Sequence, residues 1–271
     1  MAPMDDASLD KAAAMLLQAR RGRVPIAALP PDCRPDTEAD AYAIQERHVA
    51  GLLADHGGEI IGYKAGCTNV MAQQQLGLSS PFAGALLSAF VMPGLPPRGV
   101  EISSRDGFMR MIEAEIGFRL DRDLAHTGAS YTAETVRPAL AAAFGAIEVV
   151  DSRYEDWTTA GAPQLIADNA CTGFWLYGEE LTDFSHIDLT NHPVSVRRNG
   201  VLAERGTSAN VLDNPLNVAA WLANHLIARG SCLKAGQFIT TGTMIAVNGA
   251  EKGDKVEADF GSLGVVSVRF S

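Results

Sequence analysis

The sequence predicts an α+β protein in which a small helical region precedes a larger β-rich body. Apolar residues recur with a helical period over residues 1–58, whereas residues 59–271 consist mostly of strand-like segments with a few helical segments between them. Helices and strands therefore do not alternate regularly, as they would in a doubly wound parallel sheet. We accordingly divide the chain into a helical N-terminal region at 1–58 and a β-rich body at 59–271.

The N-terminal region is expected to contain two helices separated by a proline-rich break. Ser8 can cap the first helix, and Thr37 with Asp40 resembles the capping box that opens the second. Gly57 and Gly58 mark the end of the second helix. The apolar faces consist of Leu9, Ala13, Leu16 and Leu17 in the first helix and of Tyr42, Val49, Leu52 and Leu53 in the second.

The body begins with a short strand at 60–64 and a longer one at 109–120, in which apolar and acidic residues alternate. We expect a helix over about 132–143 and a strand over 146–153. Asn199-Gly200, between two strand-like segments, is a strong hairpin signal. The remaining elements are a helix that starts at Asn214-Pro215 and continues through Leu226, and strands at 238–243, 255–260 and 265–270.

Charge and hydropathy argue against several classes of partner. The chain has 32 acidic and 22 basic side chains, which gives a net charge of −10 at pH 7. Binding to nucleic acid depends on a basic face that displaces counterions, and docking on anionic lipid needs the same charge. No segment supplies the about 20 apolar residues of a membrane-spanning helix, and the acidic N-terminus differs from a signal peptide. We therefore expect a cytoplasmic protein without a nucleic-acid or membrane partner.

The spacing of the cysteines and the absence of common short motifs argue against further classes of protein. The four cysteines lie far apart and form no C-x-x-C pair, so we expect reduced thiols rather than a zinc knuckle or a disulfide framework. The sequence contains no G-x-G-x-x-G, P-loop, G-x-S-x-G or H-E-x-x-H motif, so nicotinamide, nucleotide and zinc-protease chemistry lose their main support. A Ser-His-Asp triad stays open, because its members need not be close in sequence.

The most informative feature is a pair of acids in the strand at 109–120. Glu113 and Glu115 are two residues apart and point to the same side of the strand, about 6.5–7 Å apart. Glu148, in an apolar segment, offers a third carboxylate, and three such groups would form a hard-oxygen site for Mg²⁺ or Mn²⁺. Octahedral coordination would leave room for a bidentate ligand such as a 2-oxo acid. The alternative is a solvated strand face, and Asp151 is a rival ligand that points away from Glu148 in a regular strand.

Lys64 is a second candidate for chemistry. It lies among Gly62, Ala65 and Gly66, small residues that allow the backbone to approach a ligand. A lysine beside a metal-bound enolate could stabilise negative charge or transfer a proton. The alternative is a surface lysine at the end of a strand.

Seven short segments carry a resemblance to one family. They are AYAIQ at 41–45, IGYKAGCT at 61–68, IEAEIGF at 112–118, IEVVDSR at 147–153, ADNA at 167–170, AWLAN at 220–224 and LKAG at 233–236. In this order they resemble the 2-keto-4-pentenoate hydratases, a branch of the fumarylacetoacetate hydrolase superfamily. The resemblance extends from about residue 37 to the C-terminus.

This resemblance implies a mixed β-sheet roll with a helical N-terminal part, a homo-oligomer, and a divalent cation, Mg²⁺ or Mn²⁺. The residues that it assigns are the metal ligands Glu113, Glu115 and Glu148, the catalytic Lys64, and the substrate-binding Thr68, Asn169 and Thr243. It implies a small 2-oxo acid as substrate. The reaction would be the addition of water to a 2-hydroxy-2,4-dienoate (2-keto-4-enoate), which gives a 4-hydroxy-2-oxo acid in aromatic catabolism.

Two positions depart from the family pattern. Many hydratases carry an Asp, a candidate base, directly after the proline of a Pro-Asp-aromatic-Gly segment, whereas Phe82 follows Pro81 here. Cys171-Thr172 stands where a pair of serines is common. Phe82 either accommodates a larger or more apolar substrate tail or is neutral packing.

Three alternatives to the hydratase stay open. A decarboxylase of 2-oxo diacids would use the same metal-held enolate. Hydrolysis of a carbon–carbon bond in an acylpyruvate would need a base, and no histidine lies beside the metal motifs. A non-catalytic partner subunit would be expected to have lost one of the three acids or Lys64, all of which are present.

Overall fold

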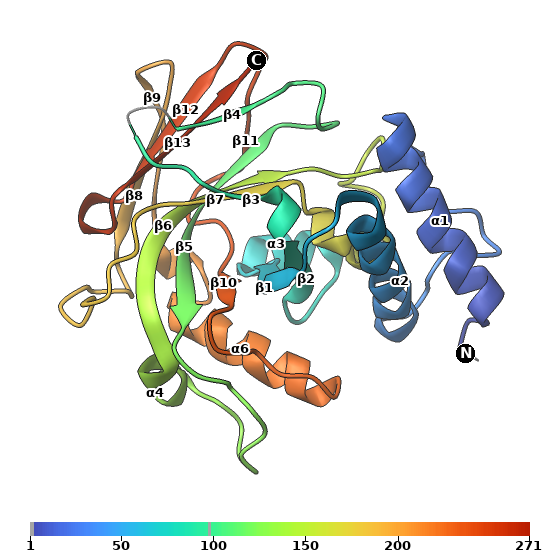
Figure 1. Cartoon of the computed structure of the whole chain (residues 1–271), viewed down its shortest axis with the longest axis horizontal. Coiled ribbons are helices and arrows are strands. Elements are labelled where there is room, and N and C mark those ends of the chain that lie inside the picture. Colours follow the sequence, from blue (N-terminus) through green and yellow to red (C-terminus); the bar gives the residue numbers. More distant parts are fainter. Residues whose placement is uncertain (1–2, 97–98) are drawn as a thin grey trace.

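Two β-sheets and a pair of N-terminal helices make up the structure, a computed structural model that describes residues 3–96 and 99–271. Helices α1 (Asp6–Gly22) and α2 (Glu38–His56) pack against each other on one side of the molecule, apart from the curved strands on the other side (Figure 1). The predicted order of a helical region followed by a β-rich body is confirmed.

The helix ends follow from local hydrogen bonds. Thr37 accepts a hydrogen bond from the Asp40 amide at the start of α2, and Gly57, with a φ of 72°, ends that helix, as predicted. The prediction of Ser8 as the first cap is wrong. Asp5 caps α1 instead and accepts from the Ser8 amide at 2.8 Å, because a carboxylate both satisfies a free amide and interacts favourably with the helix dipole.

The larger sheet has the strand order β2-β1-β10-β5-β6-β7-β3, with β11 paired to β5. Its strands are β1 (Ile60–Gly66), β2 (Phe82–Leu87), β3 (Val91–Pro93), β5 (Met111–Leu120), β6 (Leu140–Val150), β7 (Phe174–Tyr177), β10 (Phe238–Thr240) and β11 (Asn248–Gly249). The pairs β1–β10 and β3–β7 are parallel and the others antiparallel, so the sheet is mixed.

The smaller sheet has the order β4-β13-β12-β8-β9. Its strands are β4 (Val100–Ile102), β8 (Pro193–Arg198), β9 (Val201–Thr207), β12 (Lys255–Asp259) and β13 (Val265–Phe270). The remaining helices are α3 (Val70–Leu76), α4 (Ala133–Val136), α5 (Ala162–Ala167) and α6 (Pro215–Ala228), with single turns η1 (Ser88–Phe90), η2 (Arg137–Ala139), η3 (Asn169–Cys171), η4 (Ser208–Asn210) and η5 (Gly261–Leu263).

Contacts between aromatic side chains show that the larger sheet is tightly rolled. Trp175 in β7 and Phe238 in β10 have ring centroids only 5.5 Å apart, although β5 and β6 lie between their strands in the sheet. Strands about 4.8 Å apart would separate these rings by roughly 14 Å in a flat sheet. The predicted mixed roll is therefore confirmed, and β5 and β6 form its long curved wall (Figure 1).

The two faces of this wall have different partners. On one face, Gly145 of β6 approaches Phe260 beside the smaller sheet so closely that a Cβ at this position would lie 2.1 Å from the ring. On the other face lie Glu113, Glu115 and Glu148, which are therefore inside the roll. The alternation of side chains along β5 and β6 thus separates packing between sheets from the interior of the roll.

Three predicted elements have wrong boundaries. The helix predicted over 132–143 is confined to α4 and the following turn, because the chain from Leu140 onward belongs to β6. Its alanines favour a helix in isolation, but Ala142 and Ala143 pair with Arg119 and Phe118 of β5, and this pairing outweighs local propensity. The strand predicted over 238–243 ends at Thr240, and β6 ends at Val150, three residues before the predicted end.

Three other predictions are confirmed, and they concern a hairpin, a helix cap and the cysteines. Asn199 and Gly200 have φ angles of 53° and 81° and join β8 to β9 in a tight hairpin. Asn214 caps α6 by accepting from the Leu216 amide at 2.9 Å. All four cysteines are free thiols: Cys33, Cys67, Cys171 and Cys232. Among the helices of the described residues, none is long and apolar enough to cross a membrane.

Candidate active site

The three glutamates predicted to bind a metal converge inside the roll. Glu113 of β5 and Glu148 of β6 are direct cross-strand partners, and Glu115 lies two residues further along β5 on the same face. Each of the three offers an oxygen that lies within 4.8 Å of the others. The rival Asp151 faces elsewhere, because it accepts hydrogen bonds from the Phe108 and Met109 amides at 2.8 and 2.9 Å. The donor set is thus three carboxylates from two adjacent strands.

Burial contradicts the alternative of a solvated strand face. Glu115 and Glu148 are 0 % and 1 % exposed. Within the part of the chain that the structure describes, both oxygens of Glu115 and Oε2 of Glu148 have no hydrogen-bond partner. A buried carboxylate without a partner is unfavourable by several kcal/mol. Hard carboxylate oxygens around one point, left without donors, fit a divalent cation.

The pKa values of the cluster reflect this burial. Loss of hydration raises the pKa of Glu148 to about 7, although the charge of Lys64 opposes the rise. Burial and the charges of the two neighbouring acids hold the pKa of Glu115 well above its ordinary value. The pKa of Glu113 is also raised by burial. In the absence of a cation, burial therefore favours the protonated form of each of these carboxyl groups.

Lys64 lies beside these acids and is buried, which overturns the alternative of a surface lysine. It is 3 % exposed, and its Nζ donates to Oε1 of Glu148 and to the Ala170 carbonyl, the latter at 2.9 Å. Burial favours the neutral amine, but the charges of Glu148 and Glu113 raise the pKa of Lys64. The side chain is therefore an ammonium that balances one of the three carboxylates.

Small residues surround Lys64, as predicted, but protein atoms occupy the space that they leave. Gly84 pairs with Lys64 across β1 and β2, and a Cβ at Gly84 would lie 2.7 Å from the Asn169 carbonyl oxygen. A Cβ at Gly66 would lie 2.6 Å from the ring of Phe82, which is itself buried. Phe82 thus packs directly against the strand that carries Lys64.

The three residues predicted to bind substrate lie around this cluster in different settings. Thr68 is buried, and a Cβ at Gly242 would lie 2.0 Å from its hydroxyl oxygen. Thr243 follows in the same turn, and its hydroxyl donates to the Ile245 carbonyl at 3.0 Å. Asn169 accepts from the Ala85 amide at 2.7 Å and donates to the Ala85 carbonyl at 2.9 Å. Their contact with a substrate stays a prediction.

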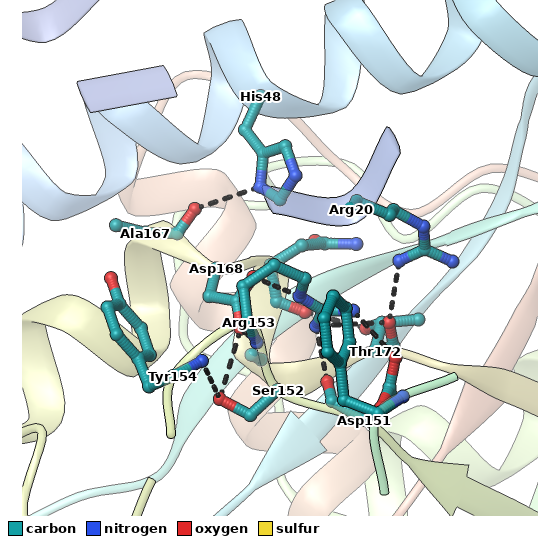
Figure 2. A network of polar contacts seen from close by, with 12 residues as sticks. Arg20, His48, Asp151, Ser152, Arg153, Tyr154, Ala167, Asp168 and Thr172 are labelled. Atoms are coloured by element: carbon teal, nitrogen blue, oxygen red, sulfur yellow. Dashed lines mark hydrogen bonds and ion pairs between the residues drawn. The ribbon is translucent and has the colours of Figure 1, made fainter. Parts of the chain in front are cut away.

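One neighbouring group was missed by sequence reasoning. A buried network of charges connects Asp151, Arg153 and Asp168 beside the turn that contains Ala170, with Arg20 and His48 contributed by the N-terminal helices (Figure 2). Asp151, Arg153 and Asp168 all lie in the motifs quoted above, where charged residues follow apolar segments. That pattern indicates buried ion pairs, but it does not indicate which residues pair.

The match to a family model now adds to this geometry. Residues 91–271 match the model described as fumarylacetoacetate (FAA) hydrolase C-terminal, which is more than half of the chain. The chain belongs to the fumarylacetoacetate hydrolase family. The mixed roll with N-terminal helices is the fold of this family, and the resemblance seen in the seven motifs is confirmed.

Relatives within the family extend over nearly the whole chain. A protein named 2-keto-4-pentenoate hydratase from Paraburkholderia phymatum is 33 % identical over 267 residues, which cover 98 % of this chain and 99 % of the relative. A 4-oxalocrotonate decarboxylase from Pseudomonas putida is 32 % identical over 86 % of each chain. The solved structure of 4-oxalocrotonate decarboxylase from Pseudomonas putida G7, complexed with magnesium and adipate, has a TM-score of 0.91 and 29 % identity over the full length of both chains.

Proposed function

We propose that the protein is a metal-dependent hydro-lyase that adds water to a 2-hydroxy-2,4-dienoate, the enol form of a 2-keto-4-enoate. The product would be a 4-hydroxy-2-oxo acid, within aromatic catabolism. The observation that carries this proposal is the cluster of three carboxylates, two of them buried, with one buried ammonium, in a chain similar to hydratases over almost its full length. A small acid with vicinal oxygens matches a cation that retains open coordination positions.

Glu113, Glu115 and Glu148 are the proposed ligands of Mg²⁺ or Mn²⁺. Both oxygens of Glu115 and Oε2 of Glu148 have no hydrogen-bond partner in the part of the chain that the structure describes, which supports this role. Three carboxylates beside one ammonium leave two negative charges unbalanced when all groups are ionised, which a divalent cation would neutralise. When bound, such a cation supplies Lewis-acid polarisation of the substrate 2-oxo group.

Lys64 is the proposed catalytic residue. Its ammonium is held between Glu148 and the Ala170 carbonyl, which fixes Nζ beside the carboxylate cluster. From this position it would stabilise the negative charge that develops on the dienolate oxygen and transfer a proton to or from the substrate. We further propose that Thr68 and Thr243 bind the substrate carboxylate and that Asn169 shapes the pocket wall through its bonds to Ala85.

A decarboxylase of 2-oxo diacids is a second candidate, favoured by one specific observation. The structure with a TM-score of 0.91 belongs to a protein named 4-oxalocrotonate decarboxylase, and the 32 % identity to such a protein equals that to many hydratases. Both reactions would proceed through the same site. Identification of the reaction products is therefore needed to distinguish a hydratase from a decarboxylase.

The first experiment follows the ultraviolet absorbance of 2-hydroxypenta-2,4-dienoate with purified protein, with and without Mg²⁺ or Mn²⁺. Metal-dependent loss of the dienol band, with 4-hydroxy-2-oxopentanoate as product, is the expected result. An unchanged band in protein that binds Mg²⁺ would reject this substrate. Released CO₂ from a 2-oxo diacid would establish the decarboxylase, and two smaller acids from an acylpyruvate would establish the hydrolase. Glu115→Gln, which removes one ligand charge, is the matched control.

Homo-oligomeric assembly, which the family resemblance implies, is a further proposal, as is the cytoplasmic location expected from the charge and hydropathy of the sequence. Light scattering of the purified protein at several concentrations measures the first. A mass equal to that of one chain at every concentration would reject it.

A further inference from the structure

Three consecutive residues beside Lys64 have a left-handed backbone. Asn169, Ala170 and Cys171 have φ angles of 50°, 53° and 56°. For residues with a Cβ this region is unfavourable, and it is normally visited by single residues, most often glycine or asparagine. A run of three that includes an alanine and a cysteine must be held by its surroundings. Strain of this kind gathers at functional sites.

The left-handed turn presents one carbonyl to the catalytic lysine. The Ala170 carbonyl accepts a hydrogen bond from Lys64 Nζ at 2.9 Å. The preceding side chain, Asn169, is bound to both backbone groups of Ala85 in β2. A right-handed turn at 169–171 would redirect the peptide groups, so the hand of the turn determines whether the Ala170 carbonyl meets Lys64.

Arg153 holds both ends of this turn (Figure 2). Before the turn, its Nε donates to Asp168 Oδ1 at 2.6 Å and its amide donates to Oδ2 of the same carboxylate at 2.9 Å. After the turn, its Nη2 reaches the Thr172 carbonyl at 3.5 Å, and Nη1 pairs with Asp151 at 3.1 Å. Arg153 is 0 % exposed, so these contacts are shielded from water. Arg20 of α1 adds a second donor to Thr172 at 3.3 Å.

We propose that Arg153 is a positioning residue that enforces the left-handed turn at 169–171 and thereby keeps the Ala170 carbonyl on Lys64. Its planar fork of donors reaches the start and the end of the turn at once, which a single ammonium cannot do. The predicted effect of Arg153 on kcat rests on the proposed function, whereas its predicted effect on the backbone conformation at 169–171 does not.

The central variant is Arg153→Lys, which keeps the buried charge and removes the fork. We expect kcat to fall by at least roughly tenfold, because a displaced catalytic group loses rate steeply with distance. KM and the Mg²⁺ affinity measured by calorimetry should stay within about threefold. Arg21→Lys is the matched control, because Arg21 forms a two-bond pair with Asp55 on the surface. It should leave kcat unchanged.

A second substitution tests whether the hand of the turn is the cause. Glycine adopts positive φ without a Cβ penalty, so Ala170→Gly makes the turn less dependent on Arg153. In the Arg153→Lys background it should restore kcat several-fold relative to Arg153→Lys by itself. If Arg153→Lys does not fold, Asp168→Asn is the replacement variant, because it weakens the Arg153–Asp168 pair while leaving the arginine in place. A smaller loss of kcat is then expected, again restored in part by Ala170→Gly.

Hydrogen exchange of the peptide covering 168–172 gives a readout that is independent of activity. Exchange there should accelerate in Arg153→Lys and not in Arg21→Lys. Unchanged exchange in Arg153→Lys would overturn the proposal. A loss of kcat that Ala170→Gly does not restore, and that is matched by an equal loss of Mg²⁺ affinity, would also overturn it. If the wild-type protein does not consume the dienoate, the proposed function fails, and the exchange result alone decides the role of Arg153.

Discussion

Two groups of buried charges lie close together in this protein, and they differ in whether the charges are matched. Around Arg153, every charged atom of Asp151, Arg153 and Asp168 has a hydrogen-bond partner. In the carboxylate cluster, three acids face one lysine, and three oxygens lack a partner among the described residues. Matched buried charges order the backbone around them, whereas unmatched ones indicate a site completed by a ligand. The two groups contact the same turn: Lys64 binds the Ala170 carbonyl, and Arg153 binds Asp168 before the turn and Thr172 after it.

The largest effect is expected from removing the ammonium of the unmatched cluster. Lys64→Met, which keeps much of the side-chain volume, should lower kcat by about 10²–10⁴-fold, the range for loss of a positioned acid or base. Mg²⁺ binding should survive, because no carboxylate is removed. Steady-state kinetics and calorimetry measure the two properties. An active Lys64→Met protein would reject the catalytic role of the lysine.

Substitutions in the two groups of charges should change the free energy of unfolding differently. Asp168→Ala leaves Arg153 without its main partner and should lower the free energy of unfolding by about 3–5 kcal/mol. Glu115→Gln removes a buried acid that has no hydrogen-bond partner among the described residues, so the metal-free protein should be equally stable or more stable. Urea unfolding of both variants and the wild type, all without metal, tests this contrast. Equal destabilisation by the two substitutions would contradict the distinction between matched charges around Arg153 and unmatched charges in the carboxylate cluster.

The unmatched cluster should also make metal binding depend on pH. The pKa of Glu148 is about 7 in the metal-free fold and 4.5 ordinarily, so the native state retains a proton that the unfolded chain releases. The contribution of Glu148 to metal-free stability should therefore fall as the pH rises from about 5 through 7. Mg²⁺ must displace this proton, so its affinity should increase by up to about tenfold per unit between pH 6 and 7. Calorimetry at both values measures it, and an affinity independent of pH would contradict the prediction.

The smallest effect concerns His48, at the edge of the matched network. Burial, followed by the charges of Arg153 and Arg20, lowers the pKa of His48 to about 3, so it is neutral in the native protein. The imidazole of the unfolded chain binds a proton below its ordinary pKa near 6.5, so the contribution of His48 to stability should fall by about 1–2 kcal/mol between pH 7 and pH 5. The difference between wild type and His48→Gln, measured by urea unfolding at both pH values, isolates this contribution. Parallel losses in both proteins would contradict it.

Much of the fold was predictable because it depends on short-range patterns. The caps at Thr37 and Asn214 and the turn at Asn199-Gly200 depend on side chains a few residues apart, and each is confirmed. The chain from Leu140 was predicted as helix because alanine favours a helix locally. Its true state depends on pairing with β5, which begins 29 residues earlier at Met111. Strand pairing at this separation leaves little local signal, so propensity alone gave the wrong element.

By itself, the sequence determined which chemical groups are available and which face of their strand they share. Glu113 and Glu115 are two residues apart in a strand, which is sufficient to place both inside the roll once Glu148 is paired opposite. Only the tertiary structure decided that Lys64 reaches Glu148, 84 residues away, and that Arg153 holds the turn at 169–171. The physical reason is that buried charges must find partners wherever the chain brings them together, and hydrogen bonds of that kind have no fixed spacing in sequence.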